Sequence, residues 1–270
     1  MEIDQEYGND PRHSEQKQNQ EQAFAMDSIS FPVVRGFHRH VGLQVNRFAT
    51  IIRDVRSKIL SATLLTLALS ATTFAQNTYG VPQKIDTTAR YLFYLHGRIV
   101  EDGRRPKSPQ FGFYEYDQIL ETLRARGFVV LSEQRTKGTE IEQYAATVAD
   151  QVRGLLKAGV PPQQITVVGA SQGSWIAMLA STYLKNRSLN FVFIAGCSAD
   201  EGFLKQVDWH GNVLSIYERT DRVGSCEKYR ADATGVGKYE EKELNTGQRH
   251  GFIYRPMSEW IEPTVAWAMK

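Results

Sequence analysis

A serine set between two glycines, where an apolar run meets a helix-like run, constrains this chain most. Gly169 and Gly173 flank Ser171, each with one residue between. The β-branched run 165–168 predicts a buried strand, and residues 174–184 predict a helix. A sharp strand-to-helix turn needs small residues on both sides, so that the backbones can approach. We therefore expect Ser171 to project from a strained turn, beside backbone N–H groups that can receive an oxyanion.

The motif alone does not establish a nucleophile. Short Gly-x-Ser-x-Gly runs arise by chance, and the alternative is a tight turn in which Ser171 merely caps the helix. A serine nucleophile also needs a histidine base and an acid that orients the base.

Three of the six histidines lie beyond residue 75, namely His96, His210 and His250. His210 precedes a Gly-Asn turn that leads into an apolar run, which predicts a place at the wrong end of the sheet. His250 lies in a loop-like stretch near the end of the chain and is the predicted base. His96 is predicted to be a structural histidine that bonds to loop backbone.

Two aspartates are candidates for the acid. Asp221 follows the apolar run 213–217, and Asp200 follows the apolar run 191–195. Both runs predict late strands of a sheet, so either loop could hold an acid near His250. We prefer Asp221. The alternative for either residue is a structural role, in which the aspartate caps a loop or forms a salt bridge.

The order Ser171, Asp221, His250 resembles that of the α/β-hydrolase superfamily, and more loosely that of its small esterase and dienelactone-hydrolase-like members. The resemblance covers residues 88–268 and includes an early His-Gly pair, His96 and Gly97, at the end of an apolar run. It implies a Ser-His-Asp triad and a nucleophile elbow. It also implies that His96 and Gly97 open an oxyanion loop.

The oxyanion site implied by this resemblance needs two backbone donors. Gln172 N–H supplies one, and Arg98 N–H is expected to supply the other. The chain departs from the glycine-rich esterase pattern here, because Arg98 is bulky and cationic. The charged stretch 98–106 is predicted to be a solvated loop, with a border of the site as the alternative.

The remaining patterns alternate strands with helices. Amphipathic or apolar runs predict further strands at 91–95 and 128–131, and helices at 116–126, 140–157 and 258–269. The predicted fold class is α/β, a doubly wound, mostly parallel sheet flanked by helices. Only about seventeen residues separate the strands at 191–195 and 213–217, too few for a lid domain. We therefore expect an open active site that is suited to small esters or exposed acyl groups.

The N-terminal part of the chain differs from the rest in its sequence pattern. Residues 1–54 are predicted to be a disordered extension or to precede the true start, for which Val55 is a candidate. Residues 55–75 run from basic to apolar to small side chains, the order of a secretory signal peptide. The alternative is an amphipathic or buried helix in an N-terminal extension. Residues 76–270 are then one catalytic domain of a periplasmic or secreted protein, with no stable membrane insertion after cleavage.

The composition of the chain limits the classes of partner and cofactor that we expect. The chain has 32 Lys+Arg and 30 Asp+Glu, a balance that argues against nucleic acid as a partner. No motif spacing suggests a metal or another cofactor. Two cysteines, Cys197 and Cys226, each follow a late strand. They could pair in an oxidising compartment and hold the acid loop, or remain two thiols.

Two classes of function stay open. The favoured one is a serine hydrolase that cleaves a carboxylic ester, with acyl transfer as a variant of the same chemistry. The other is a non-catalytic binding protein of the same fold, because a fold does not fix a function.

The predicted signal peptide can be tested by the N-terminus of the exported protein. The protein recovered from its native host should begin at Gln76 or within a few residues of it, because the small residues before Gln76 form a cleavage site. N-terminal sequencing checks this. A cytosolic protein that begins at Met1 would contradict it.

Overall fold

The computed structural model describes residues 80–197, 201–204 and 207–270. They belong to one compact unit, residues 72–270. The predicted extension 1–54, the predicted signal peptide 55–75 and the alternative acid Asp200 lie outside the described residues.

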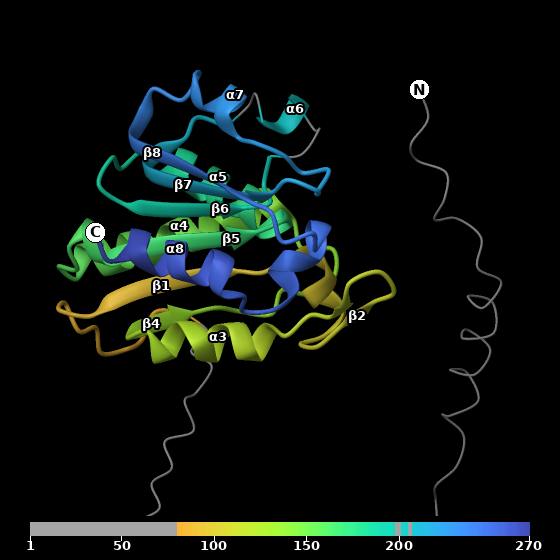
Figure 1. Ribbon diagram of the computed structural model, residues 1–270. Helices are drawn as coiled ribbons and strands as arrows, with labels where there is room; N and C mark the ends of the chain where they lie inside the picture. The colour runs from red at the N-terminus through yellow and green to blue at the C-terminus, as the bar shows by residue number, and fades with distance from the viewer. Residues whose placement is uncertain (1–79, 198–200, 205–206) are drawn as a thin grey trace, which may run out of the picture. The chain divides into compact units, whose positions relative to one another are not determined.

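Six strands form one all-parallel sheet in the order β4-β1-β5-β6-β7-β8 (Figure 1). The strands are β1 (Arg90–Leu95), β4 (Phe128–Leu131), β5 (Ile165–Ala170), β6 (Asn190–Ile194), β7 (His210–Glu218) and β8 (Gly235–Leu244). A parallel sheet needs helices on both faces, because its strands are apolar on both sides. The predicted fold class is thus confirmed.

Helices cover both faces of the sheet (Figure 1). The helix α4 (Ile141–Lys157) and the helix α5 (Gln172–Leu184) share one apolar cluster with alternate residues of β1, including Phe93. The helix α3 (Tyr116–Ala125) and the helix α8 (Ser258–Ala268) form the other cluster with the intervening residues of β1. The alternation follows from the two-residue period of a strand.

Short elements connect these layers. They are η2 (Arg98–Asp102), β2 (Lys107–Ser108), β3 (Gly112–Phe113), η3 (Pro162–Gln164), α6 (Glu201–Leu204), α7 (Glu227–Arg230) and η4 (Arg249–Tyr254). The strands β2 and β3 pair as an antiparallel hairpin. Residues 195–209 between β6 and β7 are too few for an inserted lid domain.

The strand order has one switch point, and it positions the site. The chain leaves β1 toward β4 on one side and returns to β5 on the other. In such sheets ligands bind outside the carboxyl ends of the strands at the point where the direction reverses. His96 follows β1 there and Ser171 follows β5, so the two predicted loops lie on either side of the switch point.

The predicted strands and helices are present within a few residues of their expected bounds, and β4 matches its predicted range. The strand β8 and the short elements were not predicted, namely η2, β2, β3, η3, α6, α7 and η4. Within the described part of the chain, no helix combines the length and apolarity needed to cross a bilayer.

The close packing of α5 against β1 generates a prediction about two glycines. A Cβ atom on Gly173 would lie 1.9 Å from the carbonyl oxygen of Leu95. Gly173→Ala must therefore displace backbone and should cost at least about 2 kcal/mol of unfolding free energy. Gly154, inside α4, is the matched control, because its added Cβ would meet none of the described atoms within 4 Å. Gly154→Ala should stabilise the protein by about 0.5–1 kcal/mol. Denaturant unfolding of both variants checks the pair, and equal stability of the two would contradict it.

Candidate active site

The turn between β5 and α5 is strained, as the sequence predicts. Ser171 has φ 54° and ψ −121°, a region that costs a residue with a side chain of the order of 1–3 kcal/mol. A Cβ atom on Gly169 would lie 2.2 Å from the carbonyl oxygen of Gly173. The Ser171 N–H donates to the carbonyl of Ile194 at 2.8 Å, which ties the turn to β6. The surrounding backbone thus holds the half-buried serine in this conformation.

Three predicted residues meet at this turn. The Ser171 hydroxyl lies 3.0 Å from Nε2 of His250, and Nδ1 of His250 lies 2.6 Å from Oδ2 of Asp221. The side chain of Asp221 is 6% exposed and that of His250 is 24% exposed. A nucleophile, a base and an orienting carboxylate in hydrogen-bond sequence have the geometry that serine hydrolysis requires.

Local turns of the backbone determine the positions of Asp221 and His250. Asp221 follows β7 in a turn in which its N–H donates to the carbonyl of Glu218 at 2.9 Å. His250 lies in η4, not in an irregular loop, and Arg249 before it has φ 51°. Phe111, from the hairpin between β2 and β3, packs near His250 with ring centroids 6.5 Å apart. Sequence patterns gave no sign of Phe111, because the hairpin strands have only two residues each.

His210 begins β7, at the amino end of the strand, so the prediction that it lies at the wrong end of the sheet is confirmed. Its N–H donates to the Ser181 hydroxyl at 2.7 Å, and its Nδ1 lies 2.9 Å from the carbonyl oxygen of Asp208. These contacts give His210 a structural role away from Ser171.

The predicted oxyanion loop passes beside the serine. A Cβ atom on Gly97 would lie 3.5 Å from Cβ of Ser171. Arg98 follows as the first residue of η2, in which Val100 N–H makes the first bond to the carbonyl of Gly97 at 3.2 Å. The bulky Arg98 side chain is exposed. Gln172 is the first residue of α5, where helical N–H groups lack intrahelical partners.

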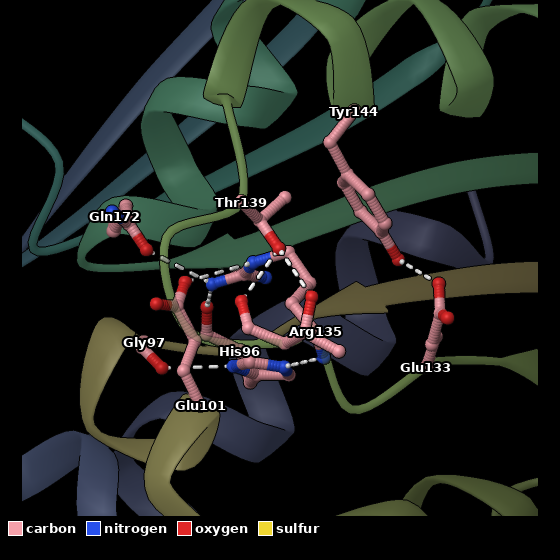
Figure 2. A network of polar contacts seen from close by, with 9 residues as sticks. His96, Gly97, Glu101, Glu133, Arg135, Thr139, Tyr144 and Gln172 are labelled. Carbon is pink, nitrogen blue, oxygen red and sulfur yellow. Dashed lines mark hydrogen bonds and ion pairs between the residues drawn. The ribbon is translucent and has the colours of Figure 1, made fainter.

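A buried arginine that was not predicted connects this loop to the first residue of α5 (Figure 2). Arg135 Nη2 donates to the carbonyl of His96 at 2.7 Å and to Oε1 of Gln172 at 3.2 Å. Nε of Arg135 lies 3.5 Å from Oε1 of Glu101, and both side chains are at least 95% buried. Arg135 comes four residues after β4, at the carboxyl end of the sheet, and that position is the signal the sequence offered.

The prediction of a solvated loop at 98–106 is wrong in its first half. Residues 98–102 form η2, and Val100 is buried against the cluster of α3 and α8. Glu101 is also turned inward, where the Arg135 guanidinium offsets the cost of burying its charge. Charge composition could not reveal this, because the partner is more than thirty residues away.

His96 is a structural residue, as predicted. Its Nδ1 lies 2.8 Å from the carbonyl oxygen of Gly97, and Arg135 N–H donates to its Nε2 at 2.8 Å. These bonds fit the neutral ring with its proton on Nδ1, because Nε2 must accept. Burial, and next the Arg135 cation, lower the pKa of His96 from 6.5 to about 3. The neutral ring joins the oxyanion loop to the segment after β4.

Of the two alternatives for the cysteines, the structure has the disulfide. Cys197, after β6, is bonded to Cys226, after β7, with a Cα–Cα distance of 5.2 Å. Gly224 also forms a β-bridge with Cys197. The two contacts tie the segment that follows Asp221 to the loop beside it.

Within the described ranges, no group of three or more His, Cys, Asp or Glu side chains could hold a metal ion.

The all-parallel sheet, the elbow after β5 and the contacts among Ser171, His250 and Asp221 together define the α/β-hydrolase fold. The class follows from the geometry of this chain itself.

No protein-family model and no curated protein matches the sequence. Similar solved structures include SOBER1 of Arabidopsis thaliana, 14% identical over 67% of this chain and 100% of that one, with a TM-score of 0.42. A sugar hydrolase from Lactococcus lactis is 12% identical over 71% of this chain and 91% of that one, with a TM-score of 0.47. A predicted CIB-like hydrolase from Thermoplasma acidophilum is 16% identical over 68% and 87%, with a TM-score of 0.43. These likenesses are too distant to carry a statement about activity.

The buried His96 generates a prediction about pH. The folded state keeps His96 neutral down to about pH 3, whereas the unfolded chain binds a proton below its ordinary pKa of 6.5. Stability is therefore full above pH 6.5 and is lost as the pH falls toward 3. Between pH 7.5 and 5.5 this group should remove about 1.4 kcal/mol of unfolding free energy. His96→Asn keeps a donor for the Gly97 carbonyl but does not titrate. Urea unfolding at both pH values should show a smaller loss in the variant, and equal losses would contradict the prediction.

Proposed function

We propose that this protein is a serine hydrolase that cleaves a carboxylic ester through an acyl-enzyme intermediate. The observation that carries the proposal is the continuous contact from Ser171 through His250 to Asp221, at 3.0 and 2.6 Å. The strained conformation of Ser171 supports it, because such strain persists where the surroundings over-determine it and is concentrated at functional sites.

The proposed reaction begins when the Ser171 hydroxyl attacks the ester carbonyl and its proton passes to Nε2 of His250. Asp221 holds the imidazole in the required tautomer and stabilises the imidazolium. The N–H groups of Gln172 and Arg98 stabilise the tetrahedral oxyanion. The C–O bond to the leaving group then breaks, and the alcohol takes the proton from His250.

The acyl-enzyme is hydrolysed by the same groups. A water molecule gives a proton to His250 as it attacks the acyl carbon, and the second oxyanion uses the same two N–H groups. Collapse of this intermediate returns the proton to Ser171 and releases the acid. An acceptor alcohol in place of water would make the protein an acyltransferase by the same steps.

The short connection between β6 and β7 supports a small-molecule ester or an exposed acyl group as substrate, because no lid domain is inserted there. Phe111, packed beside His250, offers an apolar surface next to the reacting atoms. We propose no cofactor, because the triad supplies both the nucleophile and the proton transfers.

We also propose that the protein acts in the periplasm or outside the cell. The disulfide between Cys197 and Cys226 supports this location, because such bonds persist in oxidising compartments. The basic-to-apolar order of residues 55–75 is an independent support.

Covalent labelling tests the nucleophile. A fluorophosphonate probe should label the wild-type protein, and Ser171→Ala should abolish labelling and ester hydrolysis with the fold intact, because a single hydroxyl is lost. Loss of a triad member costs on the order of 10⁴–10⁶ in turnover. Ser258→Ala, an exposed serine at the start of α8, is the matched control and should label as wild type.

The acid is tested in the same assay. Asp221→Asn should slow labelling far more than Asp200→Asn, because Asp221 is the carboxylate in contact with His250.

Two outcomes would contradict the proposed function. Labelling of Ser171→Ala within tenfold of wild type would remove Ser171 from the mechanism. A wild-type protein that is not labelled would favour the alternative of a non-catalytic binding protein.

A further inference from the structure

A second carboxylate lies behind the proposed triad. Glu218, the last residue of β7, is fully buried. Its Oε1 accepts hydrogen bonds from the N–H of Thr220 at 3.3 Å and from the Thr220 hydroxyl at 3.0 Å. Its Oε2 accepts from the N–H of Thr246 at 2.8 Å and from the Thr246 hydroxyl at 2.7 Å. All four donors are uncharged groups.

These four bonds join two loops that are far apart in the sequence. Thr220 directly precedes Asp221, and Thr246 lies four residues before His250. The main-chain carbonyl of Glu218 also accepts from Asp221 N–H at 2.9 Å. The Thr246 hydroxyl accepts in turn from Gln248 N–H at 3.2 Å, which extends the connection toward His250.

The four donors around Glu218 require an acceptor group that has no donor of its own, and a carboxylate meets this requirement. An ionised carboxylate offers about four lone-pair sites and no donor, so it can receive all four bonds at once. An amide at this place would turn an NH₂ group toward donors. Burial works to raise the pKa of Glu218, but the hydrogen bonds from Thr246 and Thr220 outweigh it and lower the pKa. A buried charge without such bonds would cost several kcal/mol.

We propose that Glu218 is a positioning residue, which fixes the loop of Asp221 against the loop of His250 and so sets the contact between acid and base. The proposal rests on the proposed function for its effect on rate, but its effect on the Asp221–His250 contact does not require turnover. The groups that the structure places against the His250 ring are Asp221, Ser171 and Phe111.

A looser contact has a distinct signature. Asp221 orients the imidazole and stabilises the imidazolium, so a weaker contact lowers the rate constant of labelling per reactive site. It also weakens the hydrogen bond of the His250 Nδ1 proton to Asp221, so the NMR signal of this proton shifts. A residue that only prevents unfolding would reduce the number of reactive sites and leave the rate constant per site and this signal unchanged.

Four variants separate these outcomes. Glu218→Gln removes the charge, and Thr246→Val removes one hydroxyl at nearly constant volume should Glu218→Gln fail to fold. Thr246→Ser restores that hydroxyl. Glu243→Gln is the matched control, an exposed carboxylate on β8 that accepts a bond from the Tyr217 hydroxyl.

Two readouts are taken on the full chain. The first is the fluorophosphonate labelling rate, corrected for the fraction of reactive sites. The second is the NMR signal of the His250 Nδ1 proton, identified by its loss in His250→Asn. Glu218→Gln and Thr246→Val should slow labelling at least about tenfold and shift this signal from its wild-type position. Thr246→Ser should recover most of both values, and Glu243→Gln should match wild type.

Folded variants with wild-type labelling rates per site and an unmoved signal of the His250 Nδ1 proton would overturn the proposal. A wild-type protein that is not labelled would overturn the proposed function alone, because the signal of this proton still reports whether Glu218 sets the contact.

Discussion

The approach of α5 to the end of β1, with no side chain between them, is the constraint on which the rest of the structure depends. Gly173 lies so close to the Leu95 carbonyl that even a methyl group would have to displace backbone. That contact directs the amino end of α5 toward the loop after β1, and Ser171 takes a strained conformation as a result. Because β1 and β5 are neighbours at the switch point of the sheet, one close contact brings the proposed nucleophile and the proposed oxyanion donors together.

Much of this could be predicted from the sequence, because the central strands are buried on both faces. The runs that became β1, β5, β6 and β7 are rich in apolar aromatic, leucine or β-branched side chains, and the glycines around Ser171 mark the turn. The strand β8 was missed for the opposite reason. It pairs with β7 alone, and residues 238–243 carry five charged side chains among six positions, so neither face shows an apolar period. The hairpin of β2 and β3 is too short to leave a period at all.

The residues of the proposed triad were expected to meet at one edge of the sheet, because their places after strands are constrained by the sheet. The groups that hold them were not predicted. Glu101 and Arg135 lie in charged or polar stretches that are typical of solvent-exposed loops, and each offsets the cost of burying the charge of the other. Glu218 likewise precedes a run of charged residues, and its four donors come from two loops that the sequence separates. Burial of a charge is a property of the folded contact, and no local pattern records it.

Two of these buried charged residues, Arg135 and Glu218, contact different groups around Ser171. Arg135 lies on the oxyanion side, bonded to the carbonyl of His96 and to the side chain of Gln172. Glu218 lies on the side of Asp221 and His250. In the proposed reaction, negative charge develops on the substrate oxygen while positive charge develops on His250. The charge of Arg135 is offset by Glu101, so on this side the guanidinium acts by holding the His96 carbonyl and Gln172 in place. Glu218 has only uncharged donors, so its fixed negative charge favours the positive charge on His250 and needs no reorganisation as that charge develops. The group that joins the two loops therefore also has the polarity that the proposed reaction requires at the base.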